Sequence, residues 1–261
     1  MLAAVRQEQI KDIILNEKTV SVVRLSELFS VSEETIRRDL NVLEEEGVLI
    51  RKHGGAIVAN RVLSEVNNNV LERVFVENKQ KIALQSRRFI KSGDCLYFDA
   101  STTAYHICKE IDDMKLTVLT NALNVMTLFS ARENVNLIGV GGSLSKTRGC
   151  FIGRIAVNTL RSYHVDKAFI SCRSISMEEG VTDSNDDIAE TKQAVIRRAN
   201  QVFLVADHSK FNKVSFTQVC TFDNIDDIIT DEPLSPQWQQ FARDHKIRLW
   251  DPSRLPEESS L

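Results

Sequence analysis

Apolar residues in the first sixty positions recur at helical spacing. Three stripes of this kind occur: Ile10, Ile13 and Ile14; Leu25, Leu28 and Phe29; and Ile36, Leu40 and Leu43. Residues three and four positions apart share one face of a helix, so the pattern predicts three short amphipathic helices. A turn at Ser30 and Val31 separates the last two helices, an arrangement typical of a helix-turn-helix.

The third predicted helix can present side chains to DNA. Ser32 is a good N-cap, and Thr35 lies near the end of a recognition helix that reaches base edges. Arg37 and Arg38 fall outside the apolar stripe, and Gly47 is the expected residue after the helix. The pattern therefore predicts a helix with two arginines on its solvent side.

A basic hairpin is predicted after this helix. Residues 48–50 are apolar, Arg51, Lys52 and His53 follow, and two glycines permit a tight reversal. Three helices and a hairpin make a winged helix-turn-helix, here assigned to residues 1–58. The alternative is a small helical bundle that binds nothing, but two basic clusters favour nucleic acid. The predicted DNA contacts are Ser32, Glu33, Thr35, Arg37, Arg38, Arg51, Lys52, His53 and Gly54.

The charge of this segment modifies that prediction. Residues 1–60 contain 8 Lys and Arg but 10 Asp and Glu, which gives net charge −2. The basic footprint usual for a DNA-binding domain is absent. The acidic run Glu44–Glu46 is expected on a solvated face away from phosphate. We expect weak non-specific affinity and binding as a homodimer or homotetramer.

Residues 59–76 are polar and without a clean period, so they are interpreted as a linker. A helix is predicted at about 77–91. Beyond it, short apolar strands alternate with helical stretches, which is typical of a parallel α/β sheet. The predicted strands are 95–98, 116–119, 135–140, 167–170 and 202–205, with late strands at 228–229 and 247–250. The α/β domain is assigned to 77–251, and a disordered tail to 252–261.

The whole chain has an ordinary globular composition. It is 43% hydrophobic, 26% charged and has net charge −3, and no apolar run approaches the ~18 residues that span a membrane. Its five cysteines show no Cys-x-x-Cys spacing, and its histidines are scattered. We therefore expect a cytoplasmic protein without a disulfide framework, metal site or cofactor.

Three polar clusters follow predicted strands, at the edge where open α/β sheets bind ligands. The first is Asp99 with Ser101, Thr102 and Thr103, at the start of a helix whose amides and dipole favour phosphate. Simple N-capping is the alternative. The second is Gly141 and Gly142, where backbone can approach a ligand. The third is Asp207–Phe211, in which Lys210 can supply a positive charge to the ligand. Together they favour a phosphorylated ligand.

Both halves of the chain, over about residues 5–232, resemble the DeoR-type family of bacterial sugar-metabolism repressors. The resemblance lies at Thr35–Leu40, Gly47, Arg51–Ala56, Asp99–Thr103, Thr120–Asn121, Gly141–Gly142, Asp166–Phe169, Glu190–Lys192 and Ala206–Phe211. It implies a sensor domain related in fold to ribose-5-phosphate isomerase, a phosphorylated-sugar effector that relieves repression, and dimers or tetramers. It adds Asn121, Arg173, Glu190 and Lys192 to the candidate effector residues.

The same kinship raises the alternative of a sugar-phosphate isomerase. Glu190 matches the general base of those enzymes, but their two acidic positions correspond here to Ile170 and Arg173. Their substrate lysine also has no counterpart between Lys167 and Lys192. Losing one acid or base typically costs at least ~10²-fold in rate, so a binding site is expected instead. Arg173 is expected to pair with phosphate or with Glu190, a purely structural ion pair being the alternative.

These patterns together predict a DNA-binding transcriptional regulator. A repressor of a carbohydrate-catabolism operon, relieved by a phosphorylated sugar, fits them best. A transcriptional activator and an isomerase-like enzyme remain the alternatives.

Overall fold

The computed structural model describes residues 3–17, 19–45, 48–58, 68–72 and 75–254. The chain divides into two compact units, Met1–Phe75 and Val76–Leu261. No helix among the described residues is long and apolar enough to cross a membrane. The predicted helix end at Gly47 and the tail from residue 255 onward lie outside the described residues.

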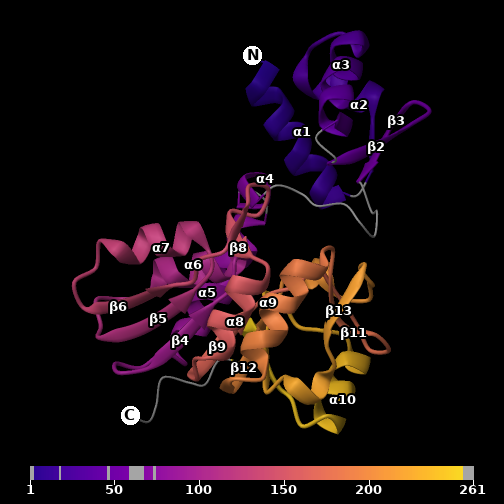
Figure 1. The fold of residues 1–261 in the computed structure, drawn as a ribbon. Helices are drawn as coiled ribbons and strands as arrows, with labels where there is room; N and C mark the ends of the chain where they lie inside the picture. The colour runs from indigo at the N-terminus through magenta and orange to yellow at the C-terminus, as the bar shows by residue number, and fades with distance from the viewer. Residues whose placement is uncertain (1–2, 18, 46–47, 59–67, 73–74, 255–261) are drawn as a thin grey trace. The chain divides into compact units, whose positions relative to one another are not determined.

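Up to Val58, the described residues of the first unit form three helices and a three-stranded antiparallel sheet (Figure 1). The elements are α1 (Ala3–Glu17), β1 (Thr19–Ser21), α2 (Val22–Phe29), α3 (Glu33–Glu45), β2 (Leu49–Lys52) and β3 (Gly55–Val58). The strand order is β1-β3-β2, so the hairpin β2–β3 gains a third strand from the segment between α1 and α2. The winged arrangement of helices and hairpin was predicted, but β1 was not.

The three predicted apolar stripes form most of the core of this unit. Ile10, Ile14, Leu25, Ile36, Leu40 and Leu43 are all buried. Leu28, however, is 57% exposed, and Val22 is buried in its place. The reason is that Ser21 caps α2 by accepting a hydrogen bond from the Arg24 amide at 3.1 Å. The helix therefore begins earlier than the stripe suggested, and its buried face is rotated.

Part of the predicted linker is helical, since α4 spans Asn68–Glu72. The next helix, α5 (Val76–Arg87), belongs to the second unit and is shorter than the predicted 77–91. Residues 59–67 lie outside the described part of the chain.

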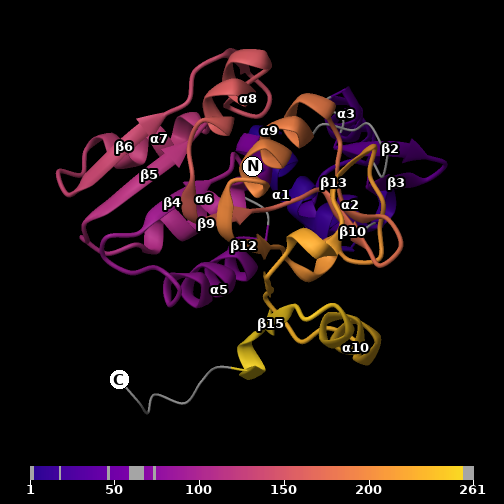
Figure 2. The ribbon, with the colours of Figure 1, turned by 60° about the horizontal axis from the view of Figure 1, so that its bottom comes forward.

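A seven-stranded parallel sheet forms the centre of the second unit (Figures 1 and 2). Its strand order is β15-β14-β12-β9-β4-β5-β6. The strands are β4 (Cys95–Phe98), β5 (Leu116–Thr120), β6 (Val135–Gly139), β9 (Val165–Ile170), β12 (Ala199–Val205), β14 (Asp227–Ile229) and β15 (Arg248–Trp250). The predicted parallel α/β sheet is confirmed.

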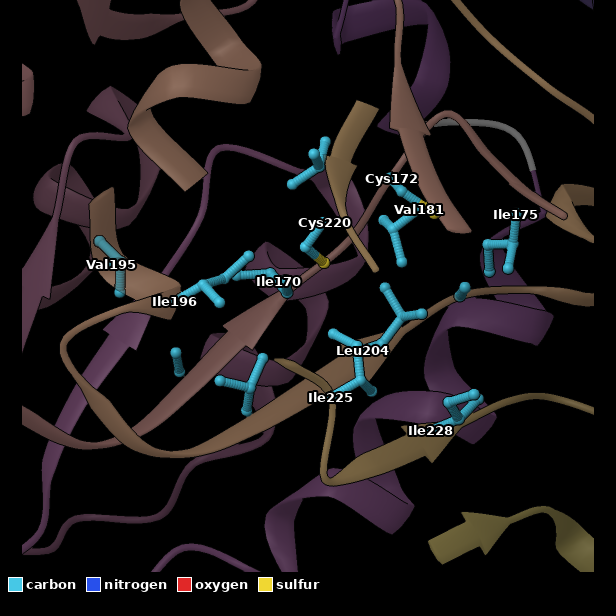
Figure 3. Close-up of a cluster of buried hydrophobic side chains, with 14 of the residues drawn as sticks. Ile170, Cys172, Ile175, Val181, Val195, Ile196, Leu204, Cys220, Ile225 and Ile228 are labelled. Atoms are coloured by element: carbon cyan, nitrogen blue, oxygen red, sulfur yellow. The ribbon is translucent and has the colours of Figure 1, made fainter. Parts of the chain in front are cut away.

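Helices cover both faces of this sheet. Side chains of α5, α6 (Thr102–Glu110) and α7 (Leu123–Ser130) pack on one face with Phe98 and Phe169. On the other face lie α8 (Arg154–Arg161), α9 (Asp186–Ile196) and α10 (Pro236–Asp244). Figure 3 shows part of this second core, where Ile170 and Leu204 from the sheet meet Val195 of α9 and Val181.

Two smaller β structures complete the unit, and neither was predicted. One is a three-stranded antiparallel sheet of β10 (Ser174–Ser176), β11 (Gly180–Asp183) and β13 (Thr217–Cys220). The other is a hairpin of β7 (Ser143–Ser145) and β8 (Cys150–Ile152). Both stand outside the main sheet and bring residues to its carboxyl edge.

Candidate functional site

A small cavity lies at the carboxyl edge of the main sheet. Its lining comes from the ends of β4 and β5, the start of α6, the β7–β8 hairpin and α9: Tyr97, Asp99, Ala100, Ser101, Asn121, Arg148, Cys150, Ile188, Thr191 and Lys192. The cavity volume is about 10 Å³, which is room for about one water molecule. Because the lining converges from segments distant in sequence, the fold itself assembles this site.

Lys192 is the centre of the charged groups in the cavity. Its ammonium lies 2.7 Å from Asp183 and 3.3 Å from Asp99, and it donates a hydrogen bond to the Ser171 carbonyl at 2.6 Å. All three charged side chains are at most 3% exposed. The guanidinium of Arg148 lies 4.0 Å from the other oxygen of Asp183. The site is therefore a buried network in which two carboxylates share one lysine.

Mutual attraction sets the protonation of this network. Burial alone would raise the pKa of Asp183, but the charges of Lys192 and Arg148 outweigh it and lower that pKa below its usual value of 3.8. Burial likewise opposes the charge of Lys192, yet Asp183 and Asp99 raise its pKa above 10.5. Both partners are thus charged at neutral pH.

Neutral groups hold the remaining lining in place. The Tyr97 hydroxyl donates to the Asn121 Oδ1 at 2.9 Å, and the Asn121 amide donates to the Phe151 carbonyl at 2.8 Å. Burial, with the charges of Asp99 and Cys150 adding to it, raises the pKa of Tyr97 well above 10. Asn121 therefore joins β5 to the hairpin that carries Arg148.

The start of α6 is capped by side chains of its own segment. Ser101 is the N-cap of α6, and its hydroxyl accepts a hydrogen bond from the Ala104 amide at 3.0 Å. Asp99 accepts from the amides of Ser101 at 3.0 Å and Ser171 at 2.9 Å. The predicted N-capping is thus present, and the same helix N-terminus faces the cavity beside a lysine and an arginine.

The arginines of α3 lie on its exposed side. Arg37 is 3.0 Å from Glu33, and Arg38 is 3.5 Å from Glu34, each one helical turn away. The Ser32 hydroxyl accepts from the Thr35 amide at 3.2 Å, which makes Ser32 the N-cap of α3. Partners that are about half to three-quarters exposed interact weakly, so both arginines can exchange their glutamates for phosphate.

The wing is fastened to α3 through Arg51. Its guanidinium donates to the Arg37 carbonyl at 3.0 Å and to Asn41 at 2.5 Å, and its amide donates to Glu44 at 2.7 Å. Arg51, a predicted DNA contact, therefore positions the wing. Glu44 is exposed, as expected for a solvated face, and it also accepts from the wing. Lys52 and His53 are exposed beside the hairpin reversal.

The two glycines of the wing have separate roles. Gly54 has φ +79°, a left-handed conformation that side chains disfavour. Gly55 pairs with Ser21 of β1, where an added Cβ would lie 2.1 Å from the Val20 carbonyl oxygen. A larger residue at either position would disturb the reversal or separate β1 from the wing.

Comparison with protein families accords with both units. The DeoR-like helix-turn-helix domain matches residues 6–62, and the DeoR C terminal sensor domain matches residues 74–232. The chain belongs to the DeoR family of transcriptional regulators. The resemblance predicted from the sequence is confirmed.

Bacterial regulators match over 86% or more of their own length, and the first of them, YulB, is itself uncharacterised. The HTH-type transcriptional regulator YulB of Bacillus subtilis (strain 168) is 38% identical over 95% of this chain and 96% of that protein. The HTH-type transcriptional repressor GlcR of the same strain is 34% identical, covering 85% and 86%. The L-fucose operon activator of Escherichia coli (strain K12) is 32% identical, covering 88% and 96%.

Among solved structures, ribose 5-phosphate isomerase A from Methanocaldococcus jannaschii aligns with 51% of this chain and 53% of its own. The identity is 16% and the TM-score 0.38, so we draw no functional conclusion from this likeness.

In this DeoR-family chain, four predicted effector residues line the cavity: Asp99, Ser101, Asn121 and Lys192. Others lie elsewhere. Thr102 and Thr103 are buried in the first turn of α6, and Gly142 packs closely against the Ile152 carbonyl and Ala156. Lys210 lies 3.8 Å from Asp207. Gly141 is also absent from the lining.

Glu190 and Arg173 differ from their predicted arrangement. Glu190 lies on the exposed side of α9, 3.7 Å from Arg161 of α8, and is not part of the cavity lining. The expected pairing of Arg173 with Glu190 is therefore wrong. Arg173 is half-buried, and burial together with the charge of Arg148 lowers its pKa. These two arginines thus lie near one another.

Sequence reasoning missed Asp183, Arg148 and Cys150, which come from the unpredicted β structures. The one available signal was the polar run Thr182–Asn185 directly before a helix.

A histidine–carboxylate group lies at another point of the sheet edge. His208, Asp231 and Glu232 bring ligand-type atoms within 4.8 Å of one another. Asp231, however, accepts from the His208 amide at 2.7 Å and from Asn78 at 2.5 Å, and lies 2.7 Å from the His208 ring. Donors already occupy this carboxylate, so we assign it no metal.

Proposed function

We propose that this DeoR-family regulator is a repressor of a carbohydrate operon and that a phosphorylated sugar binding in the sheet-edge cavity releases it from DNA. The observation that carries this proposal is the buried Lys192–Asp99–Asp183 network beside the N-terminus of α6, in a chain with a DeoR-like DNA-binding unit.

The cavity chemistry suits both parts of such a ligand. Phosphate fits the N-terminus of α6 at Ser101, with Arg148 as a cationic partner. Sugar hydroxyls can donate to the carboxylates of Asp99 and Asp183. A neutral sugar would offer Arg148 no charge to compete with Asp183, which favours the phosphorylated form.

The ligand must open the site. A cavity of about 10 Å³ cannot hold a sugar phosphate, so the lining has to move. Arg148 lies on the β7–β8 hairpin and is held 4.0 Å from Asp183. A phosphate that attracts Arg148 would compete with this contact and shift the hairpin. An effector changes DNA affinity only through such a difference between states.

Several features favour binding over turnover. A general base needs a carboxylate free to take a proton near neutral pH. The low pKa of Asp183 and its ion pair with Lys192 make it a weak base, and Glu190 lies outside the cavity. We therefore propose that the protein is not an enzyme. Turnover of an aldose phosphate would contradict this.

DNA binding is proposed to use paired winged helices. Residues at the start of α3 enter the major groove, and the wing, with Lys52 and His53, contacts the backbone. Two copies would bind two half-sites on the DNA. A small change in the distance between the two winged helices would therefore lower the affinity for DNA. Activation remains the second candidate, because a relative that is 32% identical is an operon activator.

The test is fluorescence anisotropy of the full chain on DNA from upstream of its own gene, at two salt concentrations. Sugar phosphates and the matching free sugars are titrated in. We expect specific binding that one sugar phosphate releases and its free sugar does not. Persistent binding with every phosphate would contradict the effector assignment, and absent specific binding would contradict the regulator assignment.

A matched pair of variants locates the effector. Arg148→Met should raise the effector concentration needed for release at least tenfold, on the scale of a lost charged hydrogen bond of about 1.5–3 kcal/mol. Lys146→Met changes an exposed lysine of the same hairpin and should leave the titration unchanged. Equal effects of both would indicate general electrostatics rather than a cavity contact.

A further inference from the structure

The two edges of the main sheet differ in how they are protected. The β15 edge is three residues long, carries Arg248 and is followed by Asp251 and Pro252. The β6 edge is five residues long and consists of Val-Asn-Leu-Ile-Gly, without charge or proline. Within the described residues, β6 pairs only with β5. Proteins usually shield free edges with charge, proline or short strands, so β6 lacks the usual protection.

Charge is also depleted around β6. Between Lys115 and Lys146, thirty residues contain only Arg132 and Glu133 as charged side chains, although 26% of the whole chain is charged. This segment nevertheless reaches the surface, where Leu123 is 44% exposed and Leu144 is 46% exposed. Depletion of charge with apolar exposure is characteristic of the buried centre of a protein interface.

These residues belong to connected elements, which we call the β6 face: β6, α7, the β7–β8 hairpin and the first turn of α8. A Cβ on Gly139 of β6 would lie 3.2 Å from the Met126 sulfur of α7. The Leu123 amide donates to the Gly149 carbonyl in the hairpin at 2.9 Å. Ile155 of α8, shortly after β8, is 65% exposed. Figures 1 and 2 both show β6 as the outermost strand of its side of the sheet.

We propose that the β6 face binds a second copy of this chain about a twofold axis, with the two β6 strands antiparallel. In a twofold contact each surface meets its own copy, so any charge near the axis meets its like. The β6 face carries few charged side chains, Lys146 and Arg154 among them, so few like charges would meet across the axis. A free strand edge is complementary to itself, because its N–H and C=O groups satisfy those of an antiparallel copy. This proposal does not depend on the effector assignment.

Light scattering on the full chain tests the proposal. The wild type should have at least twice the 29.5 kDa chain mass at micromolar concentration. Leu123→Glu places like charges across the axis and should halve that mass, weakening association at least about 30-fold, as expected for a central interface residue. Residue 123 is the first residue of α7, where an acidic side chain favours the helix, so folding is retained.

Leu84→Glu is the matched control, since Leu84 is 53% exposed on α5, away from the β6 face. It should leave the mass unchanged. A monomeric wild type, an unchanged mass for Leu123→Glu, or an equal loss in Leu84→Glu would overturn the proposal.

Cross-linking tests the strand pairing directly. Asn136→Cys places an exposed thiol on β6, and a short bis-maleimide should join two such chains in high yield. Arg248→Cys places a thiol on β15, at the opposite edge, and should cross-link no more than the wild type. Equal yields from the two variants would overturn the β6 pairing even if the protein is dimeric.

Discussion

The ion pairs on α3 and those in the sheet-edge cavity lie at opposite extremes of burial. On α3, Arg37 and Glu33 are each about half exposed, and Arg38 is 78% exposed. In the sheet-edge cavity, Lys192 and Asp183 are 3% and 0% exposed. Exposed pairs contribute little to stability, whereas removing one member of a buried pair leaves an uncompensated charge. The α3 arginines are therefore available to a ligand at small cost, while the cavity charges are part of the fold.

The first unit itself contains a buried counterpart. The Arg6 Nε lies 2.6 Å from Asp39, which also accepts from Gln7 at 2.9 Å, and Arg6 and Asp39 are both buried. Asp39 directly follows Arg38, yet it anchors α3 to α1. Burial, rather than the unit in which a residue lies, separates structural charges from those available to ligands.

The largest expected effect is that of Lys192→Met. It leaves Asp99 and Asp183 buried without their cation, so the free energy of unfolding should fall by about 3–5 kcal/mol. Both tryptophans, Trp238 and Trp250, lie in the α/β unit, so their fluorescence during urea unfolding reports on this unit. Lys146→Met, at an exposed site, should stay within about 0.5 kcal/mol of the wild type. If Lys192→Met lowered the free energy of unfolding by less than about 1 kcal/mol, the cavity charges would not be part of the fold in the way the comparison with α3 requires.

Acid should weaken the same network. The pKa of Asp183 is lower in the folded protein than its usual value, so its ionised form adds stability above about pH 4. That contribution is lost as pH falls through the folded pKa. The raised pKa of Lys192 preserves its contribution until pH rises well above 10.

Urea unfolding at a series of pH values measures this effect. The free energy of unfolding of the wild type should decline more steeply below pH 4 than that of Asp183→Asn. Near neutral pH neither value should change with pH. Parallel curves would show that Asp183 is not the group responsible.

A smaller effect is expected for Arg38→Ala, and it should concern binding alone. Operator affinity should fall by about 1–3 kcal/mol, roughly tenfold to hundredfold, with unfolding changed by no more than about 0.5 kcal/mol. Fluorescence anisotropy and urea unfolding measure the two quantities. Arg87→Ala removes an exposed ion pair in the other unit and is the control. A large loss of stability in Arg38→Ala would remove the distinction between the two regions.

The smallest effect is expected for Glu33→Gln. It removes the partner of Arg37 and a negative charge from the end of α3 that is proposed to face DNA. Stability should change by about 0.3–0.5 kcal/mol, and DNA affinity should rise a few-fold, more at low salt. Glu45→Gln, at the other end of the helix, should have less effect on affinity. Reduced affinity in Glu33→Gln would instead indicate that Glu33 reads a base.

Local patterns predicted the fold better than the site. The stripes ending in Leu40 and Leu43 and the strand–helix alternation from Cys95 onward depend on neighbouring residues, and the structure contains the corresponding elements. Asp99 and Ser101 could also be placed from local sequence, because they directly follow a strand, and both line the cavity. Asp183 could not be placed, because β11 is short and its pairing with β13 joins segments distant in sequence.

Glu190 illustrates the converse error. The resemblance to the isomerases matches Glu190 to their general base, in the same segment as Lys192, but residues two positions apart on a helix point in different directions. Lys192 faces the cavity, while Glu190 faces Arg161. The direction of a side chain on α9 depended on how the helix packs, which the sequence pattern did not determine.

The small volume of the cavity has a kinetic consequence. With room for about one water molecule, the cavity would have to open before the proposed effector could enter. Association then requires prior opening, and the observed rate will rise with effector concentration only until it equals the opening rate. The measured dissociation constant will exceed that of the open site by the reciprocal of the fraction of open molecules. A substitution that loosens the β7–β8 hairpin would therefore increase sensitivity to the effector without adding a contact to it.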